Sequence, residues 1–189
     1  MKKKYTIGRN ISINLDMEKL SKLKEELTKK YITRVGVLGQ KTNRIPMLTG
    51  ESHERYQMRV KKIMKSKPEI AENGEKTNAE IGLVHEMGSS SDHIPRRSFL
   101  DMPLTLKMPE YAKQFSNQLM KAVDDGNIKP VYINLGIKGE QVVQLAFSSR
   151  GFGIWPANRP STIALKGSSQ PLIDTAQLRR SITSDVVNK

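Results

Sequence analysis

Residues 78–100 read NAEIGLVHEMGSSSDHIPRRSFL, and this stretch decides how the middle of the chain folds. Asn78 is a favoured residue for capping the start of a helix, and Gly88 is a favoured residue just past the end of one. The polar turn that follows contains Pro95, and the large apolar residues Phe99 and Leu100 come soon after it. The pattern predicts a helix, a rigid bend, and an apolar pair that packs back on the helix.

Apolar periodicity predicts further elements on both sides of this stretch. Leu20, Leu23, Leu27 and Tyr31 fall on one face of a helix that Asp16 would cap. Residues 31–38, YITRVGVL, are rich in β-branched residues and predict a strand. The other predicted elements are helices at 109–123, 139–148, 161–165 and 174–182, and an edge strand or flexible tail at 184–189. The mixture predicts an α+β fold, a small antiparallel sheet packed with several helices.

The length of 189 residues suits a single domain over residues 1–189. Residues 1–14 form a basic N-terminal arm in this prediction. Residues 40–77 are polar, mostly basic and interrupted by Pro and Gly, which predicts a long loop or insertion. Tyr56, Val60, Ile63 and Met64 predict a short amphipathic helix inside it.

Composition excludes several classes of protein. There is no cysteine, so disulfides and thiolate metal sites are excluded, which fits assembly in a reducing cytoplasm. Lys2, Lys3 and Lys4 are not followed by the apolar stretch of a signal peptide. No window reaches the roughly 18 apolar residues of a membrane span. We therefore expect a soluble protein without membrane contact.

The formal net charge of +13 is concentrated in the first third of the chain. Residues 1–65 hold 17 Lys or Arg and 6 Asp or Glu, a net charge of +11, whereas residues 66–189 hold 15 and 13, a net charge of +2. Such asymmetry favours an acidic partner, either nucleic acid or an acidic protein surface. A solvated basic face that keeps the protein in solution explains it equally well.

No motif predicts catalysis. His85-Glu86 resembles the start of a zinc-protease helix, but position 89, where the second histidine belongs, is serine. A metal-dependent hydrolase would need a site built from His85, His53 and His93, and it is kept as a third hypothesis. The simpler interpretation is that His85 and Glu86 end a helix and hydrogen-bond to the turn that follows. We expect no catalytic residue, no metal and no cofactor.

A nucleic-acid-binding protein is the second hypothesis. Residues 150–153, RGFG, match the first half of the RNP1 signature of RNA-recognition motifs, and residues 131–135 are similar to its RNP2 strand. The second half of RNP1 does not match, and Pro156 would break a central strand. This alternative therefore includes both RNA-recognition-like and non-specific binding.

Two segments resemble the tail-completion and neck proteins of tailed bacteriophages, the virion-morphogenesis group. The first is residues 78–88 and 94–100, where the group reads Asn-Ala-x-Ile-x-x-x-His-Glu-x-Gly and then Ile-Pro-x-Arg-x-Phe-Leu. The second comprises Trp155, residues 160–167, PSTIALKG, and residues 171–182, PLIDTAQLRRSI. Over residues 171–182 the group reads Pro-Leu-Ile-Asp-Thr-Gly-x-Leu-x-x-Ser-Ile. Residues 34–39, RVGVLG, are also similar. Ala176 stands where the group has Gly, and we expect it to be an ordinary helical position rather than a strained one.

The resemblance implies a structural virion protein that is not an enzyme. Such proteins form a ring at the neck or the head-proximal end of the tail and join the tail to the head, with sixfold symmetry favoured over twelvefold. The implied partners are further copies of the chain, a tail terminator or tube protein, and head-completion or connector proteins, with non-specific contact to genomic DNA in the channel. The implied location is the virion, assembled in the cytoplasm of the host bacterium.

Several residues are candidates for these contacts. Arg96 and Arg97 can form bidentate hydrogen bonds to carboxylates of a neighbouring subunit. We expect Trp155 to lie in the core, Asp174 and Thr175 to cap a helix, and Leu178 to pack inward. The interface candidates are Arg96, Arg97, Phe99, Leu100, Tyr56, Lys61 and Lys62, and the signature positions are His85, Glu86, Gly88, Pro95, Trp155, Asp174, Thr175 and Leu178.

Overall fold

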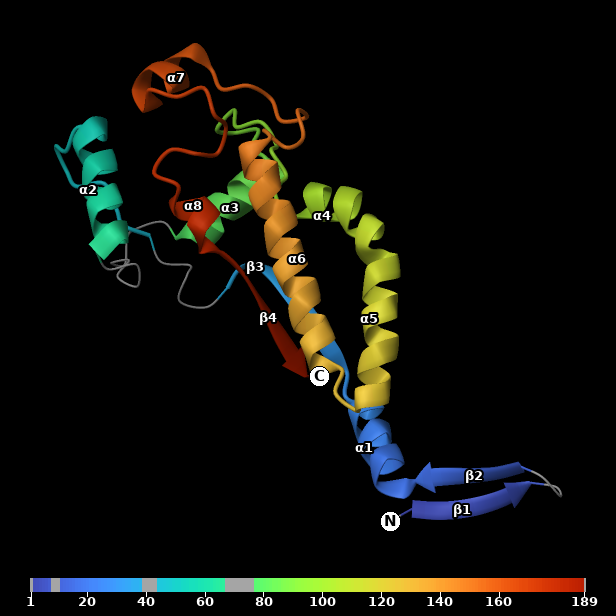
Figure 1. Ribbon diagram of the computed structural model, residues 1–189. Helices are drawn as coiled ribbons and strands as arrows, with labels where there is room; N and C mark the ends of the chain where they lie inside the picture. The colour runs from blue at the N-terminus through green and yellow to red at the C-terminus, as the bar shows by residue number, and fades with distance from the viewer. Residues whose placement is uncertain (1, 8–10, 39–43, 67–76, 189) are drawn as a thin grey trace. The chain divides into compact units, whose positions relative to one another are not determined.

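The computed structural model describes residues 2–7, 11–38, 44–66 and 77–188, and it has the predicted α+β fold (Figure 1). The elements in chain order are β1 (Lys2–Ile7), β2 (Ile11–Asp16), α1 (Met17–Thr28), β3 (Tyr31–Val37), α2 (His53–Ser66), α3 (Asn78–Met87), α4 (Asp101–Lys107), a 3₁₀ turn η2 (Met108–Tyr111), α5 (Ala112–Asp125), α6 (Lys129–Ser148), α7 (Pro160–Lys166), α8 (Gln177–Ser181) and β4 (Ile182–Asn188).

Residue contacts divide the chain into two compact units that are not consecutive in the sequence. Unit 1 comprises Met1–Arg34, Glu110–Gly136 and Asp185–Lys189, and unit 2 comprises Val35–Pro109 and Ile137–Ser184. The strands β3 and β4 and the helix α6 each contribute residues to both units. The predicted domain over residues 1–189 therefore contains more than one hydrophobic core.

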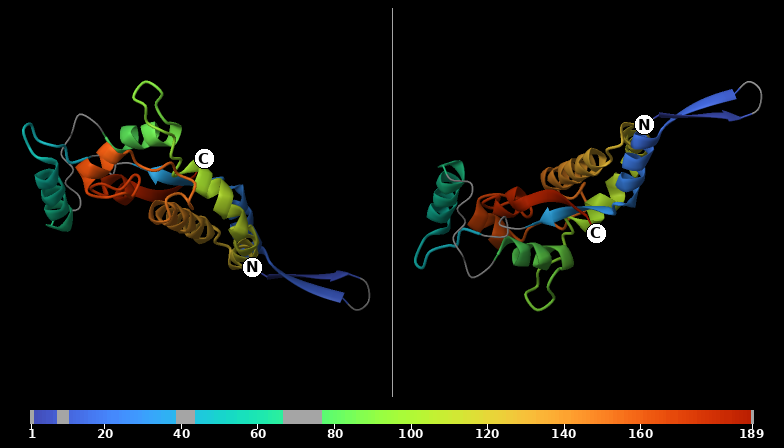
Figure 2. Two further views of the ribbon diagram at one scale, coloured as in Figure 1. Left: turned by 90° about the horizontal axis from the view of Figure 1, so that it is seen from above. Right: turned by 90° about the horizontal axis from the view of Figure 1, so that it is seen from below.

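The strands form two small sheets (Figures 1 and 2). β1 and β2 are an antiparallel hairpin in which Lys2 lies opposite Asp16 and Ile7 opposite Ile11. The predicted basic arm thus carries a hairpin, and Asp16 is the last residue of its second strand. β3 is the predicted strand, and it pairs with β4, which confirms the edge strand predicted at the C-terminus.

The core of unit 1 lies between α5 and the start of α6. Ala122, Ile128 and Val131 are buried, and Tyr132 packs between Tyr31 and Phe115 with ring centroids 5.5 Å and 5.8 Å away. The helix predicted at 109–123 is confirmed as η2 and α5. For the predicted apolar face of α1, Leu20 is largely exposed, and the side chains of Leu23 and Leu27 lie outside the described residues.

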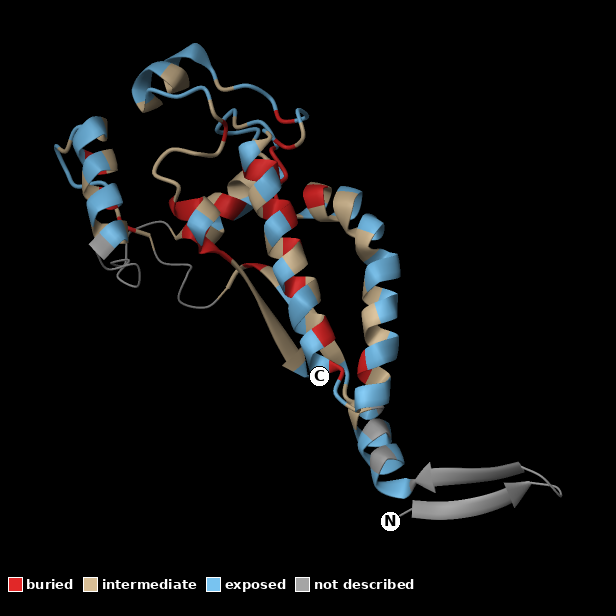
Figure 3. Ribbon diagram, in the orientation of Figure 1, coloured by how far each residue is buried: buried red, intermediate tan, exposed pale blue. Residues whose placement is uncertain are grey.

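The main core of unit 2 is built on α6, whose buried residues are red in Figure 3. The helix predicted at 139–148 is present but begins ten residues earlier, at Lys129. Pro130 occupies the first turn, where its missing N–H has no helical partner to lose. The buried members of this core are Phe99, Val143, Ala146, Phe147, Trp155, Leu178 and Ile182.

The early start of α6 contradicts the secondary structure that the RNA-recognition-like interpretation requires. Residues 131–135 had to be a strand for the RNA-recognition-like interpretation, and they are helical. The interpretation failed because an apolar run of this length suits a buried helix as well as a strand. The strand that the RNA-recognition-like interpretation requires at these residues is therefore contradicted.

Gly139 lets α6 approach β3 closely. A Cβ atom added there would lie 2.8 Å from Cγ2 of Val35. We expect Gly139→Ala to lower the free energy of unfolding by about 1–3 kcal/mol, because the helix must move away from the strand. Chemical denaturation of Gly139→Ala, Val35→Ala and the double variant measures this. The double variant should recover part of the loss, and strictly additive effects would contradict the proposed clash.

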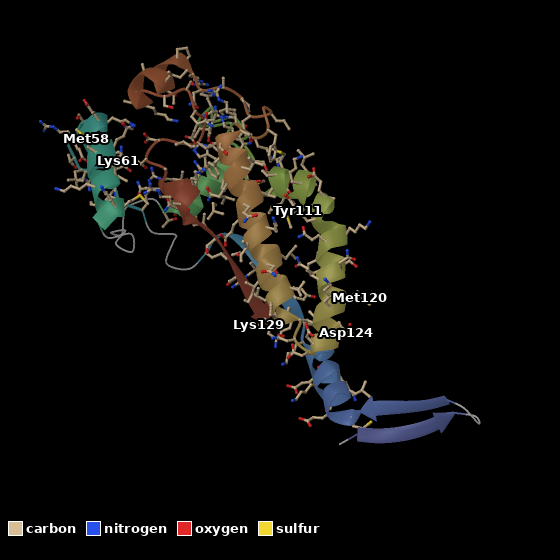
Figure 4. The ribbon with its side chains drawn as sticks, viewed as in Figure 1. Met58, Lys61, Tyr111, Met120, Asp124 and Lys129 are labelled. Carbon is tan, nitrogen blue, oxygen red and sulfur yellow. The ribbon has the colours of Figure 1, made fainter. Side chains whose placement is uncertain are left out.

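The predicted insertion at 40–77 contains a longer helix than expected, α2, and residues 39–43 and 67–76 lie outside the described residues. Ile45, Tyr56 and Val60 form a second small core in unit 2, and the Tyr56 hydroxyl donates to the Ile45 carbonyl at 3.0 Å. The guanidinium of Arg59 lowers the pKa of Glu51 to about 2 and links α2 to the preceding loop. Figure 4 labels Met58 and Lys61 on the exposed side of this helix.

Candidate assembly interface

The helix α3 begins and ends with local hydrogen bonds that its sequence encodes. Thr77, not Asn78, is the N-cap: its hydroxyl accepts from the Glu80 backbone N–H, and the Glu80 carboxylate accepts from the Thr77 backbone N–H. Asn78 is buried and accepts a hydrogen bond from Arg44. Gly88 ends the helix as predicted, with φ of 78° and its N–H donating to Val84.

The carboxylate of Glu86 organises the turn after α3. It accepts hydrogen bonds from the backbone N–H groups of Phe99, Leu100 and Asp101 at 2.8, 3.0 and 3.1 Å. It also accepts from the Ser98 hydroxyl at 2.5 Å. These amides are the free donors at the start of α4, where a negative charge is stabilised by the helix dipole. The prediction that Glu86 binds the following turn is confirmed.

Phe99 packs between α3, α6 and α8. Its ring lies 3.2 Å from the position that a Cβ on Gly82 would occupy, and Leu178 lies 3.3 Å from the same point. Phe147 is tilted against it with centroids 5.4 Å apart. The prediction that Phe99 packs against the helix ending at Gly88 is confirmed, and Leu100 is half-buried beside this core.

Trp155 is a core residue, as predicted. It is 7% exposed, its ring meets Phe147 edge-on at 5.8 Å, and its indole N–H donates to the Ser98 carbonyl at 2.9 Å. The indole also covers Gly151, where a Cβ would lie 2.3 Å from the ring. The Trp155 loop is thereby fixed to the segment that Glu86 holds.

The two adjacent arginines differ in their surroundings. Arg97 is 6% exposed and donates to the carbonyls of Pro156 and Ala157 at 2.8 and 2.9 Å. Its guanidinium therefore holds the Trp155 loop within the same chain, which differs from the intersubunit bond expected for it. Arg96 is exposed and donates to the Glu86 carbonyl at 3.0 Å, so its side chain remains accessible. Pro95, between Ile94 and Arg96, is also exposed.

The second signature segment packs on the α2 region in a way the sequence did not predict. Asp174 does not cap α8: its carboxylate lies 3.0 Å from His53 Nε2 and accepts from Gln57 at 2.6 Å. Thr175 accepts from the Gln177 side chain, whose amide also reaches the Tyr56 hydroxyl. The capping prediction is wrong because α8 begins only at Gln177.

Ala176 corrects a further expectation. It has φ of 60° and lies in the left-handed region, so it is not an ordinary helical position. We expect Ala176→Gly to raise the free energy of unfolding by about 0.5–1 kcal/mol, because the strain relieved outweighs the entropy gained by the unfolded chain. Thermal or urea denaturation checks this, with Ala164→Gly on the exposed face of α7 as a control that should lower stability. A loss of stability at both positions would contradict the strain.

An open pocket of about 1070 Å³ lies beside these segments within unit 2. Its walls come from α3, the turn at residues 88–97, the Trp155 loop, α7 and residues 172–178. Four of its lining residues are the basic residues Arg44, Arg97, Arg159 and Lys166. The sequence predicted a subunit interface for Arg97 and no site for the other three. The four residues are far apart in the sequence, and no local pattern could have found them.

His85 lies on the wall of this pocket. Its Nδ1 is buried and has no hydrogen-bond partner in the described part of the chain, so the predicted bond from His85 to the turn is absent there. Burial, followed by the nearby charges of Arg97, Lys166 and Arg44, lowers the pKa of His85 from 6.5 to about 4. The imidazole is therefore neutral at pH 7.

This pKa makes stability depend on pH. The unfolded chain protonates His85 near pH 6.5 and the folded chain only near pH 4. The free energy of unfolding should therefore fall as the pH falls through this interval, by about 3 kcal/mol in full, and level off below it. Urea denaturation from pH 7.5 to 4.5 measures the slope before Glu51 begins to contribute. His85→Gln should flatten it, and an unchanged slope would assign the effect to other groups.

No family model matches this chain. Neither the curated proteins nor the solved structures contain a match to it. The resemblance to bacteriophage proteins is therefore carried by the quoted residues alone.

The described residues contain neither a cluster of metal-ligating side chains nor a membrane-spanning helix. Among residues 2–7, 11–38, 44–66 and 77–188, no three His, Asp or Glu side chains are grouped so as to hold a metal ion. His53, one of the three histidines considered for such a site, instead contacts Asp174. No helix in the same ranges is long and apolar enough to cross a membrane.

Proposed function

We propose that this chain is a structural protein of a tailed bacteriophage that forms a ring at the neck or head-proximal end of the tail and joins the tail to the head. The observation that carries the proposal is that the two signature segments interlock. Phe99 of the first segment and Leu178 of the second meet over Gly82, and Glu86 holds residues 98–101, which directly follow the arginine pair. The resemblance therefore falls on one folded site and not on scattered positions.

The proposed mechanism is recognition without catalysis. A ring needs two different surfaces on each subunit, because each copy contacts one neighbour on either side. Further surfaces bind a tail terminator or tube protein on one side and head-completion or connector proteins on the other. Sixfold symmetry is favoured over twelvefold to match the tail, and the virion is the proposed location.

The accessible candidates for these contacts are fewer than the sequence suggested. Arg96, Lys61 and Lys62 have exposed side chains, whereas Tyr56 is buried against Ile45. Arg97 and Phe99 are buried as well. We therefore place the proposed interface on the exposed basic side chains and assign the buried residues to holding its shape.

Quantitative mass spectrometry of purified virions tests the proposal. We expect this protein at about six or twelve copies in each particle, as a closed ring requires. Arg96→Ala combined with Lys61→Ala should leave a folded protein that is incorporated poorly, with Lys113→Ala on α5 as the matched control. Absence of the protein from infectious particles would overturn the structural role.

Non-specific nucleic-acid binding remains the second candidate function, and the net charge of +11 in residues 1–65 favours it. It predicts that the isolated protein binds duplex DNA of any sequence and that the affinity falls steeply with salt concentration. Fluorescence anisotropy with labelled duplex DNA at several salt concentrations measures this affinity and distinguishes nucleic-acid binding from the assembly role. Tight binding by a protein that is missing from the virion would replace the assembly role.

A further inference from the structure

The pocket beside α3 carries an excess of positive charge. Five Arg or Lys side chains and two Asp side chains line it, a net charge of +3 with histidine neutral. The basic residues come from separate parts of unit 2 and converge only in the folded chain. They are Arg44, Arg96, Arg97, Arg159 and Lys166.

Four of these cations donate to neutral acceptors. Arg44 donates to the Asn78 side chain at 3.3 Å, Arg159 to the His93 carbonyl at 3.2 Å, and Lys166 to the Gln170 carbonyl at 2.8 Å. Arg97 donates to two carbonyls of the Trp155 loop. Within the described ranges none of the four has a carboxylate oxygen within 4.0 Å, so their geometry is fixed while their charge is left without a direct counterion.

The two acidic groups of the wall are already engaged. Asp174 contacts His53 and Gln57, and Asp92 accepts from the Ser89 hydroxyl at 2.6 Å. Asp174 acts on Lys166 through its field, but burial and the charge of Arg97 still leave the pKa of Lys166 below its ordinary value. Partly buried cations without a direct counterion are costly, and a bound anion would remove that cost.

The size of the pocket favours a peptide over a small ion. A volume of about 1070 Å³ is that of a site for a large ligand. Its donors are side chains spread over several segments, not a single cradle of backbone N–H groups such as holds one phosphate. The buried Nδ1 of His85 adds a polar atom on the same wall, and it has no hydrogen-bond partner among the described residues.

We propose that this pocket binds the carboxylates of an acidic peptide segment on a protein partner, through Arg44, Arg159 and Lys166. Guanidinium groups suit this task because their N–H pairs match the two oxygens of a carboxylate. The identification of the partner as a neighbour in the virion rests on the proposed function. The binding itself does not, and it is measured on the purified full chain.

The test uses a fluorescein-labelled hexaglutamate peptide and anisotropy at low salt. Lys166→Gln and Arg159→Gln are each expected to weaken binding by about fivefold or more, since each removes one charge-assisted contact. Lys113→Gln and Lys129→Gln are the matched controls, because they remove the same charge from exposed positions outside the pocket. Circular dichroism shows whether each variant is folded. If Lys166→Gln does not fold, the affinity of Arg159→Gln alone decides whether the pocket binds the peptide.

Three outcomes are informative. Selective loss in the pocket variants, with no competition by inorganic phosphate at equal charge concentration, supports a carboxylate site. Equal weakening in pocket and control variants overturns it, because binding would then follow the overall charge of +13. Displacement of the peptide by low concentrations of phosphate also overturns it in favour of a phosphate site. None of these results depends on whether the protein is found in virions.

Discussion

Replacement of Phe99 by alanine is expected to lower the free energy of unfolding by about 3–5 kcal/mol, the usual cost of emptying a large aromatic site. The side chain is 1% exposed and contacts Phe147, and it lies against Gly82 at the junction of both signature segments. Urea denaturation monitored by the fluorescence of Trp155 measures the loss directly.

Leu83→Ala is the matched control, because Leu83 lies on α3, the helix against which Phe99 packs, but is 64% exposed. It should change stability by no more than about 0.5 kcal/mol. If Phe99→Ala were as stable as this control and failed only in particle assembly, Phe99 would be an intersubunit contact. The burial argument would then be wrong.

The second large effect is expected at Glu86. Removing its carboxylate by Glu86→Ala leaves the N–H groups of Phe99, Leu100 and Asp101 without their acceptor. Hydrogen bonds to a charged acceptor and the lost interaction with the start of α4 together suggest a cost of about 2–4 kcal/mol. Chemical denaturation gives the value, and hydrogen exchange at residues 99–101 should accelerate.

Two further variants sharpen this prediction. Glu86→Gln keeps the shape but presents one amide group to backbone donors, so it should lose nearly as much stability as Glu86→Ala. Glu54→Gln removes an exposed carboxylate from α2 and should cost less than about 0.5 kcal/mol. If Glu86→Gln were fully stable, the negative charge would not matter and the capping argument would fail.

The sequence predicted the local parts of this site well. The end of α3 at Gly88 and the packing of Phe99 on that helix follow from apolar pattern and glycine placement, and both are present. The binding of Glu86 to the next turn also follows, because a carboxylate at the end of one helix lies near the free N–H groups of the next. Short sequence separation made these contacts predictable.

Its errors share a physical origin. Arg97 was expected at a subunit interface, but a guanidinium satisfies carbonyl oxygens inside its own chain equally well. Asp174 is of a residue type that often caps helices, but its carboxylate instead contacts His53 and Gln57 of α2, which are distant in the sequence. Residue type specifies which bonds a side chain can form, whereas its partner is chosen by the packing of remote segments.

By itself, the sequence determined the α+β class, most helices and strands, the sites of the turns and the uneven charge, because these depend on neighbours within a few residues. Only the tertiary structure decided that the chain has two units, that Ala176 adopts a left-handed conformation, and that Arg44, Arg97, Arg159 and Lys166 share one pocket. Contacts over such sequence separations depend on how the helices pack around Phe99 and Trp155, and no local pattern of residues encodes that packing.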